Sequence, residues 1–307
     1  MQIGQLRCFL AVADERHFTR AARTLGLAQP SVSAQVRSLE SAVGAQLFHR
    51  MKGRIALTDA GEALLPFARR IIADVDAASS QLREVGGLAR GRLAVGATPS
   101  LAATLVPPVL VRFHAAYPGI DLALREAGSE DLVAAVEEGT VDIALVILPV
   151  RHEILETQAL LREELVLAVS RTHPLAKRKT IAVADLRDVP LVMFREGYDL
   201  RNATEAACRA AGFAPSFAVE GGEMDGVVRL TAAGLGAAIV PSIVVAENAS
   251  LRAVRIAQPA LTRTIGLAHR RDRRLSRAAQ EMVETVRALV RDRSWLKNAP
   301  PGLTALR

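Results

Sequence analysis

An apolar repeat with a period of seven residues, between residues 57 and 85, divides this chain of 307 residues into two parts. One position of the repeat is filled by Leu57, Leu64, Ile71, Ala78 and Val85, and the other by Gly61, Ala68, Val75 and Leu82. Eight of these nine residues are apolar, so the pattern predicts a helix with the seam of a two-helix coiled coil. The alternative is an amphipathic helix that packs on its own domain. We favour pairing with a second copy, because a helix that links two domains has little of its own chain to pack on.

Two short helices joined by a tight turn are predicted before this repeat. The first has its apolar residues on one face, at helical spacing: Leu6, Phe9, Leu10 and Ala13. The second begins near Phe18, with Thr19 as its expected N-cap and Gly26 directly after its end. These elements leave only Leu27 and Ala28 before the next helical pattern begins.

The third predicted helix has one apolar side and one small, polar side. It begins at Gln29, with Pro30 suited to its first turn, and stops at Gly44. The expected buried stripe is Val32, Val36, Leu39 and Val43. The other side is nearly free of acidic residues and carries Gln29, Pro30, Ser31, Ser33, Ala34 and Arg37. Such a face fits a DNA major groove, where these polar side chains exchange hydrogen bonds with base edges.

A basic hairpin is predicted after the third helix. Its strands are Gln46–Arg50 and Arg54–Leu57, and the turn between them contains Lys52. Arg50, Lys52 and Arg54 form a wing suited to contact phosphates. Residues 1–58 hold eight basic and three acidic side chains, a local charge of +5. The alternative is a solvated three-helix scaffold with scattered arginines; the coincidence of turn, face, wing and charge favours DNA binding.

Residues 1–58 resemble the winged helix-turn-helix domain of LysR-type transcriptional regulators. The residues that match are, in order, Phe18-Thr19-Arg20-Ala21-Ala22, Gln29-Pro30-Ser31-Val32-Ser33, Leu39-Glu40, Gly44, Leu47-Phe48 and Leu57-Thr58-Asp59-Ala60-Gly61. Ala28 departs from the family, which often has a capping Ser there. The polar face of the third helix, the basic wing and the resemblance together give the DNA-binding candidates. These are Arg20, Gln29, Pro30, Ser31, Ser33, Ala34, Arg37, Arg50, Lys52 and Arg54. It also implies that residues 59–88 are a linker helix that pairs two DNA-binding heads.

From Gly91 the pattern changes to short apolar strands that alternate with helices, which predicts a parallel sheet covered on both faces. The first elements are Arg92–Ala97, Leu101–Ala116, Asp121–Glu126, Asp131–Glu138 and Asp142–Ile147. Separate strands Leu155–Leu161 and Glu164–Ser170 then begin a second unit, and Ser276–Arg291 is a final helix. We expect a domain over 89–307, with lobe I formed by 91–161 plus 266–307 and lobe II by 162–265.

Three segments are expected to face a cleft, because ligands of open α/β sheets bind beyond the carboxyl ends of the strands. Thr98 and Ser100, and then Ser129, each follow a strand and open a helix; the third segment is Phe194-Arg195-Glu196-Gly197. The binding candidates are Thr98, Ser100, Ser129, Phe194, Arg195 and Gly197. Arg195 and the helix N-termini suggest a small carboxylate ligand. The alternative is that the hydroxyls are N-caps and that Arg195 is a surface ion-pair member.

The resemblance extends to this body. LysR-type regulators carry a two-lobed, periplasmic-binding-protein-like (type 2) effector domain that binds a small inducer between its lobes, and Ala232–Pro241 is similar to a segment that these domains share. The peroxide-sensing branch uses two cysteines of the second lobe, but this chain has Asp199 at the reactive position. We therefore expect Cys208 to be a core residue and no disulfide switch within one chain.

Several protein classes are excluded by the composition. No apolar run approaches a membrane span, and the N-terminus lacks the pattern of a secretory signal, which suggests a cytoplasmic protein. The two cysteines lie 200 positions apart, so no disulfide framework is available. The six histidines lack metal-binding spacings and no nucleophile elbow is present. We expect no enzyme, no cofactor and no metal site.

The combined expectation is a sequence-specific transcriptional regulator whose activity depends on a small inducer. Its expected partners are double-stranded DNA, that inducer, further copies of itself in a dimer or tetramer, and RNA polymerase as a further candidate. Ligand closure of the cleft would re-angle the heads through a hinge near Gly86-Gly87. Two other classes stay open: a solute-binding protein, which residues 91–270 alone would suggest, and an enzyme on the α/β body.

Overall fold

The computed structural model describes residues 1–51, 54–84, 91–150, 152–292 and 301–306. Residues up to 87 belong to one compact unit and nearly all the others to a second. Lys52, Val85 and the expected hinge at Gly86-Gly87 lie outside the described residues. None of the described helices combines the length and the apolar character that a membrane span needs.

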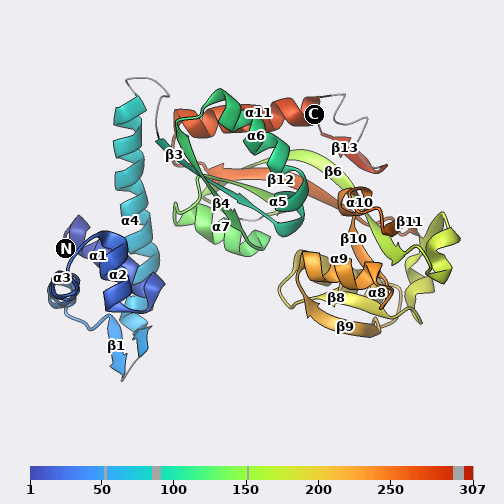
Figure 1. Ribbon diagram of the computed structural model, residues 1–307, viewed down its shortest axis with the longest axis horizontal. Helices are drawn as coiled ribbons and strands as arrows, with labels where there is room; N and C mark the ends of the chain where they lie inside the picture. The colour runs from blue at the N-terminus through green and yellow to red at the C-terminus, as the bar shows by residue number, and fades with distance from the viewer. Residues whose placement is uncertain (52–53, 85–90, 151, 293–300, 307) are drawn as a thin grey trace. The chain divides into compact units, whose positions relative to one another are not determined.

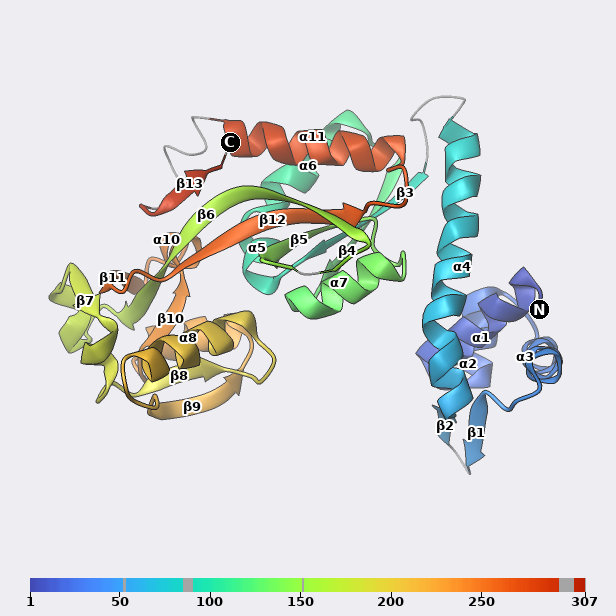
Figure 2. The same cartoon turned by 180° about the vertical axis from the view of Figure 1, so that it is seen from behind.

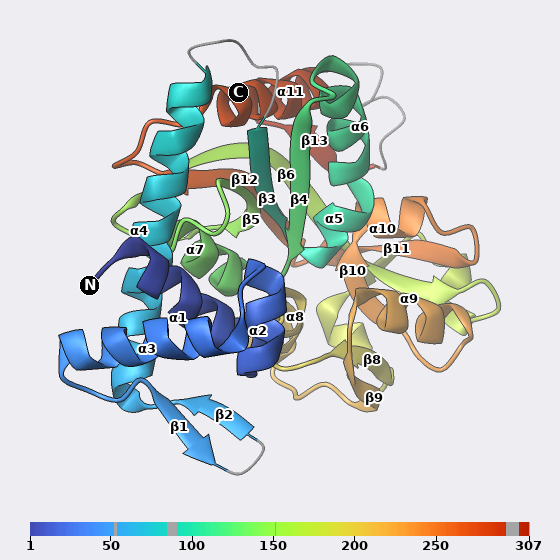
Figure 3. The same cartoon turned by 60° about the vertical axis from the view of Figure 1, so that its left-hand side comes forward.

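The first unit begins with a helical head. Its elements are α1 (Ile3–Glu15), α2 (Phe18–Leu25), α3 (Gln29–Val43), β1 (Phe48–Met51) and β2 (Arg54–Leu57), labelled in Figures 1 and 3. The two strands pair antiparallel, with Phe48 opposite Leu57. Phe9 of α1 and Phe48 of β1 are fully buried, with their ring centres 5.4 Å apart. The hairpin therefore closes the core of the helices.

Two details of the head differ from the sequence predictions. His17, not Thr19, caps α2, because its ring Nδ1 accepts a hydrogen bond from the Thr19 amide at 3.1 Å. The buried stripe of α3 comprises Val32, Val36 and Leu39, whereas Val43 is 40% exposed. Val43 is the last residue of its helix and lies beyond the helices that cover the stripe. The ends at Gly26 and Gly44 are confirmed: both have a left-handed backbone, with φ of 65° and 72°.

The long helix α4 (Asp59–Glu84) packs on the head over its first half. Gly61 and Ala68, two seam positions of the seven-residue repeat, are buried, and Leu64 and Ile71 pack against the core of the head. The first half of α4 is therefore an amphipathic helix that packs on its own domain, which was the alternative interpretation. The expectation that α4 has little of its own chain to pack on is wrong for this half. Contacts of α4 with α1 and β2, and of Gly61 with Leu47, explain this burial.

The second unit is built on a mixed sheet. Its first-lobe strands are β3 (Gly91–Ala97), β4 (Ile120–Glu126), β5 (Ile143–Leu148), β6 (Leu155–Ser170) and β12 (Thr262–Arg270), in the order β4-β3-β5-β12-β6. Strand β3 runs parallel to β4 and β5, but β12 runs antiparallel to β5 and β6. The predicted parallel sheet is therefore correct for three strands and wrong for the other two.

Helices cover both faces of this sheet, as predicted. The helices α5 (Pro99–Thr104), α6 (Val106–Ala116) and α11 (Arg277–Arg291) lie on one face, and α7 (Ser129–Glu137) lies on the other (Figures 1 and 3). Side chains of β5 alternate between the two layers: Ile143 and Leu145 face the first, and Ala144 and Val146 face the second. The predicted single helix over 101–116 is divided at Leu105.

Strand β6 is one continuous strand where the sequence suggested two. Its first part pairs with β12 and its second part, from Leu165, pairs with the second lobe. Arg162 and Glu163 lay between the two predicted strands. Glu163 is nevertheless fully buried, because Arg263 of β12 pairs with it. The chain passes between the lobes here and again just before β12 (Figure 2).

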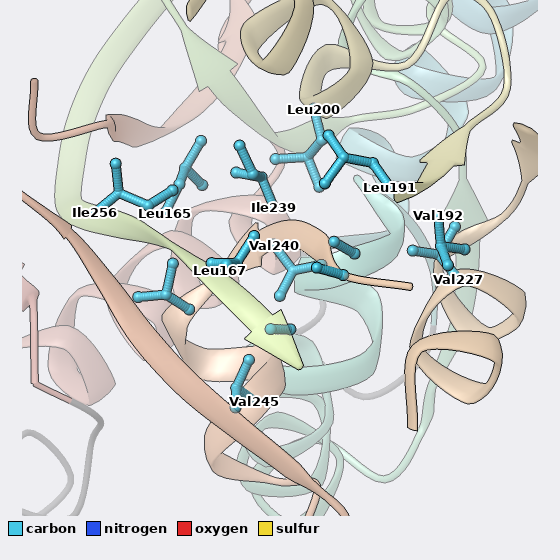
Figure 4. Packing of buried hydrophobic residues seen from close by; sticks show 14 of the residues in the cluster. Leu165, Leu167, Leu191, Val192, Leu200, Val227, Ile239, Val240, Val245 and Ile256 are labelled. Carbon is cyan, nitrogen blue, oxygen red and sulfur yellow. The ribbon is translucent and has the colours of Figure 1, made fainter. Parts of the chain in front are cut away.

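The second lobe encloses its own core, part of which Figure 4 shows. Its elements are η1 (Pro174–Lys177), β7 (Thr180–Ala182), η2 (Val183–Leu186), β8 (Leu191–Phe194), α8 (Asp199–Ala210), β9 (Phe217–Gly222), α9 (Met224–Ala232), β10 (Ala238–Pro241), α10 (Ser242–Ala246) and β11 (Leu251–Gln258). A short strand near the end of the chain, β13 (Leu303–Ala305), pairs with β6 at Leu161–Glu163. No strand was predicted at β7, β11 or β13, and no helix at α10.

Candidate functional site

Helix α3 presents a small, polar surface on the side away from its buried stripe. Gln29, Pro30, Ser31, Ala34 and Arg37 are exposed, and Ser33 is half-buried. The Arg37 guanidinium donates to the Ser33 hydroxyl at 3.3 Å, one helical turn earlier. No side-chain cap opens this helix at Ala28; the Ser31 and Val32 amides bond to the Ala28 carbonyl. The predicted reading residues therefore share one accessible face.

The other basic candidates of the head lie around this helix. Arg50 belongs to β1 and Arg54 to β2, so both stand on the predicted wing, and Lys52 falls outside the described residues. Arg20 of α2 pairs with Glu15 at 3.4 Å and also donates to the Glu15 carbonyl. Arg20 therefore links the start of α2 to the end of α1.

A small cavity lies between the lobes of the second unit. It is lined by Thr98, Pro99, Ser100, Gly128, Ile147, Tyr198, Asp199, Leu200 and Arg263. Its volume of about 10 Å³ is room for roughly one water molecule. The predicted candidates Thr98 and Ser100 are in the lining, whereas Phe194, Arg195 and Gly197 are not among the described lining residues. The lining residues therefore leave little free space at this point between the lobes.

Ser129 connects the two lobes beside this cavity. Its hydroxyl donates to the Asp199 carboxylate at 2.7 Å and accepts a hydrogen bond from the Ile147 amide at 3.1 Å. Asp199 is the first residue of α8, in the second lobe. Ser129 is thus a contact between the lobes, although the alternative reading made it an N-cap. The sequence analysis placed Asp199 at the reactive position of peroxide sensors but assigned it no role.

A buried ion pair lies behind the cavity, where the chain crosses between the lobes. Arg263 donates through Nε to Glu163 Oε2 at 2.9 Å, and its Nη2 lies 2.8 Å from the same oxygen. Arg263 Nη1 donates to the Ser100 hydroxyl at 2.9 Å. Glu163 Oε1 accepts from the amide of Ile243, at the start of α10, at 2.9 Å. The network joins both lobes, and its partners are too far apart in sequence for a local pattern to predict it.

Two hydroxyl groups of the lining have no hydrogen-bond partner among the described residues. They belong to Thr98, which is 4% exposed, and Tyr198, which is 6% exposed. Burial, followed by the nearby carboxylates of Glu223 and Glu126, raises the pKa of Tyr198, so its phenol remains a hydrogen-bond donor at neutral pH. A ligand that entered the cavity would meet both hydroxyls with their bonding capacity unused.

The third predicted segment, Phe194-Arg195-Glu196-Gly197, contacts the lining residue Tyr198. The Phe194 ring stacks on that of Tyr198, with ring centres 4.7 Å apart. Arg195 pairs with Glu223, and its guanidinium lies 5.6 Å from the centre of the Tyr198 ring. The alternative reading of Arg195, an exposed ion-pair member, describes its position. Gly197 has a φ of 77° in the loop before α8, where residues with a Cβ are disfavoured.

Both cysteines are buried and free. Cys8 is 2% exposed in α1, and Cys208 is fully buried in α8. Burial raises the pKa of both thiols, which disfavours the reactive thiolate. The prediction that Cys208 is a core residue is confirmed.

Comparisons with known proteins agree with this architecture. Residues 3–62 match the bacterial regulatory helix-turn-helix domain of the lysR family, and residues 86–291 match the LysR substrate binding domain. The chain is 33% identical over 289 residues to the transcriptional dual regulator GltC of Bacillus subtilis (strain 168), covering 93% of this chain and 96% of GltC. It is 28% identical over 291 residues to the transcriptional dual regulator OxyR of Escherichia coli (strain K12), covering 94% and 95%.

Solved structures of full-length regulators share the fold. The LysR family transcriptional regulator CbnR has a TM-score of 0.72 at 27% identity, covering 95% of this chain and 100% of CbnR. CbnR in complex with its target DNA has a TM-score of 0.70 at 28% identity, covering 94% and 99%. A helix-turn-helix head, a linking helix and a two-lobed body occur here in that order over nearly the whole chain. The chain therefore belongs to the LysR family of DNA-binding transcriptional regulators.

Proposed function

We propose that α3 is the recognition helix and reads its operator through Gln29, Ser31 and Arg37. The observation that carries this proposal is the exposure of these side chains on one face, with no acidic residue between Gln29 and Leu39. Arg37 is the residue suited to pair with a guanine in two hydrogen bonds. Arg50, Lys52 and Arg54 of the wing would hold phosphates and so position the helix without reading bases.

A gel-shift assay tests this assignment, once sequencing of bound genomic fragments has identified an operator. Arg37→Ala should reduce the preference for the operator over a site with one changed base pair by about 1–3 kcal/mol. Arg7→Ala is the matched control, because Arg7 lies on α1 and pairs with Asp76 of α4. It removes the same charge but should leave the preference unchanged. If Arg37→Ala discriminated as well as wild type, α3 would not be reading through Arg37.

We propose that a second copy of the chain pairs along α4. Phe67, in the first half of α4, is 65% exposed although other residues of that half pack on the head, which is unusual for so large an apolar side chain. Phe67→Ser should shift the sedimentation of the protein towards the monomer. Ile3→Ser is the control, because Ile3 is also an exposed apolar residue, 46% exposed, on α1 of the same head. Equal sedimentation of both variants and wild type would exclude Phe67 from the pairing.

The inducer is proposed to bind at the interlobe cavity. Thr98, Ser100 and Ser129 stand at or beside the cavity, and the unused hydroxyls of Thr98 and Tyr198 support this site. Because this cavity has room for only about one water molecule, we expect a larger ligand to displace the residues that line it, which would link binding to a change of shape. In transcription reactions with purified RNA polymerase, Tyr198→Phe and Thr98→Val should weaken the response to the inducer and retain operator binding. An unchanged response in both variants would remove this site.

A further inference from the structure

The charge balance of the interlobe cavity is negative. Arg263 is the only basic side chain among the described lining residues, and its charge is matched by Glu163, which is fully buried against it. The Arg263 guanidinium also uses its Nη1 on Ser100. Its Nη2 lies 2.8 Å from Glu163 Oε2 and has no hydrogen-bond partner among the described residues, so Arg263 keeps an unused donor but adds no net positive charge to the cavity. Asp199 is the remaining charged group of the lining.

The Asp199 carboxylate has no basic partner among the residues that the structure describes. Its one hydrogen bond is the 2.7 Å contact from the Ser129 hydroxyl, whereas a carboxylate can accept about four. The N-terminus of α8 adds a partial positive charge, but the Asp199 carboxylate keeps capacity for further hydrogen-bond donors and has no full counter-charge among the described residues. Arg195, the nearest candidate cation on the same loop, is engaged with Glu223 instead.

Two unpartnered hydroxyls support the binding of a ligand beside this carboxylate. The buried hydroxyls of Thr98 and Tyr198 line the same cavity and have no partner among the described residues. They can bond to any second polar group of a ligand, because a hydroxyl both donates and accepts.

We propose that the effector of this protein carries a protonated amine, which Asp199 binds in place of the Ser129 hydroxyl. This inference rests on the proposed effector site. An ammonium group has three donors and a full positive charge, so it satisfies the carboxylate that Ser129 satisfies only in part. Its entry breaks the Ser129–Asp199 hydrogen bond, which joins the lobes. Binding and release of this interlobe contact are therefore the same event, and the structure gives no such advantage to a carboxylate ligand.

Matched ligands test the charge preference. The probes are propylamine, 1-propanol and propionate, with their butyl and pentyl counterparts, followed by ligand-observed NMR on the full-length protein. We expect the amines to bind and the carboxylates of the same length not to bind. Asp199→Asn should weaken amine binding about tenfold or more, since a charge-assisted hydrogen bond is lost. The asparagine amide oxygen can still accept from Ser129, which preserves the fold.

Asp225→Asn is the matched control. Asp225 lies on α9 and is exposed, with Arg229 as its partner. Asp225→Asn therefore has the same net charge as Asp199→Asn but leaves the residues of the cavity unchanged. It should bind the amines as wild type does. The proposal is overturned if propionate and its homologues bind while the amines do not, if no amine binds at millimolar concentration, or if Asp199→Asn binds amines unchanged. If carboxylates bind to wild type and their binding is lost in Tyr198→Phe, the proposed effector site is supported and only the proposed amine preference is refuted.

Discussion

The buried pair of Arg263 and Glu163 allows a sharp test of what holds the two lobes together. Arg263→Met removes both contacts to Glu163 Oε2 and the donor to Ser100. Glu163 would then keep the Ile243 amide at 2.9 Å and the Ser242 hydroxyl at 3.4 Å, without a counter-charge. Removal of one partner from a buried pair costs about 3–5 kcal/mol. At the lower end this changes the unfolding equilibrium by a factor of about 150.

The double variant Arg263→Met with Glu163→Met separates charge from packing. Two apolar residues of similar volume replace the pair; the Ile243 amide and the Ser242 hydroxyl lose their acceptor, and the Ser100 hydroxyl loses its donor. We therefore expect the double variant to lie within about 2 kcal/mol of wild type, so that it is more stable than Arg263→Met alone.

Urea unfolding followed by circular dichroism measures these differences, and hydrogen exchange of β6 and β12 peptides locates them. Arg229→Met is the control, because its pair with Asp225 is exposed on both sides and should contribute less than about 1 kcal/mol. A loss below about 1 kcal/mol for Arg263→Met, or a double variant less stable than the single one, would refute this account of the crossing.

Three further predictions follow from local features. Gly61→Ala should destabilise the head by about 1–3 kcal/mol or more, because a Cβ there would overlap the Leu47 carbonyl oxygen; Gly4→Ala, which meets nothing within 4 Å, is the thermal-unfolding control. Burial lowers the pKa of His173, so the unfolded chain binds more protons and stability should fall as pH drops below about 6.5. His173→Gln should flatten that slope in urea titrations at several pH values. Peptide mapping after peroxide treatment should find Cys208 in no intrachain disulfide, since both thiols are buried.

The head was predictable from the sequence because its signals are local. Helix ends at Gly26 and Gly44 follow from the backbone freedom of glycine, and α3 begins at Gln29 as expected. The error at Thr19 arose because His17 provides the cap with a ring nitrogen, which is not among the preferred N-cap groups. The repeat of α4 indicated a buried seam but not which neighbour buries it.

The body was predictable only in outline. Strand–helix alternation gave the layers, but the continuity of β6 depends on Glu163, whose partner Arg263 lies 100 residues away. Thr98 and Ser100 were placed correctly in the lining because they follow a strand. Tyr198 and Asp199 were not assigned to it. Their role depends on the second lobe facing the first, and periodicity within a segment carries no information about that.

The strand β13 has a consequence for the behaviour of this protein with other chains. It covers the outer edge of β6 where the lobes meet: the Glu164 amide bonds to the Gly302 carbonyl and the Leu306 amide to the Leu160 carbonyl. Without residues 302–306 that edge would present unpaired amides and carbonyls, which recruit strands from other molecules. A shortened chain should therefore aggregate even though each lobe keeps its core. Strand β13 thus protects this edge of the sheet from pairing with other molecules.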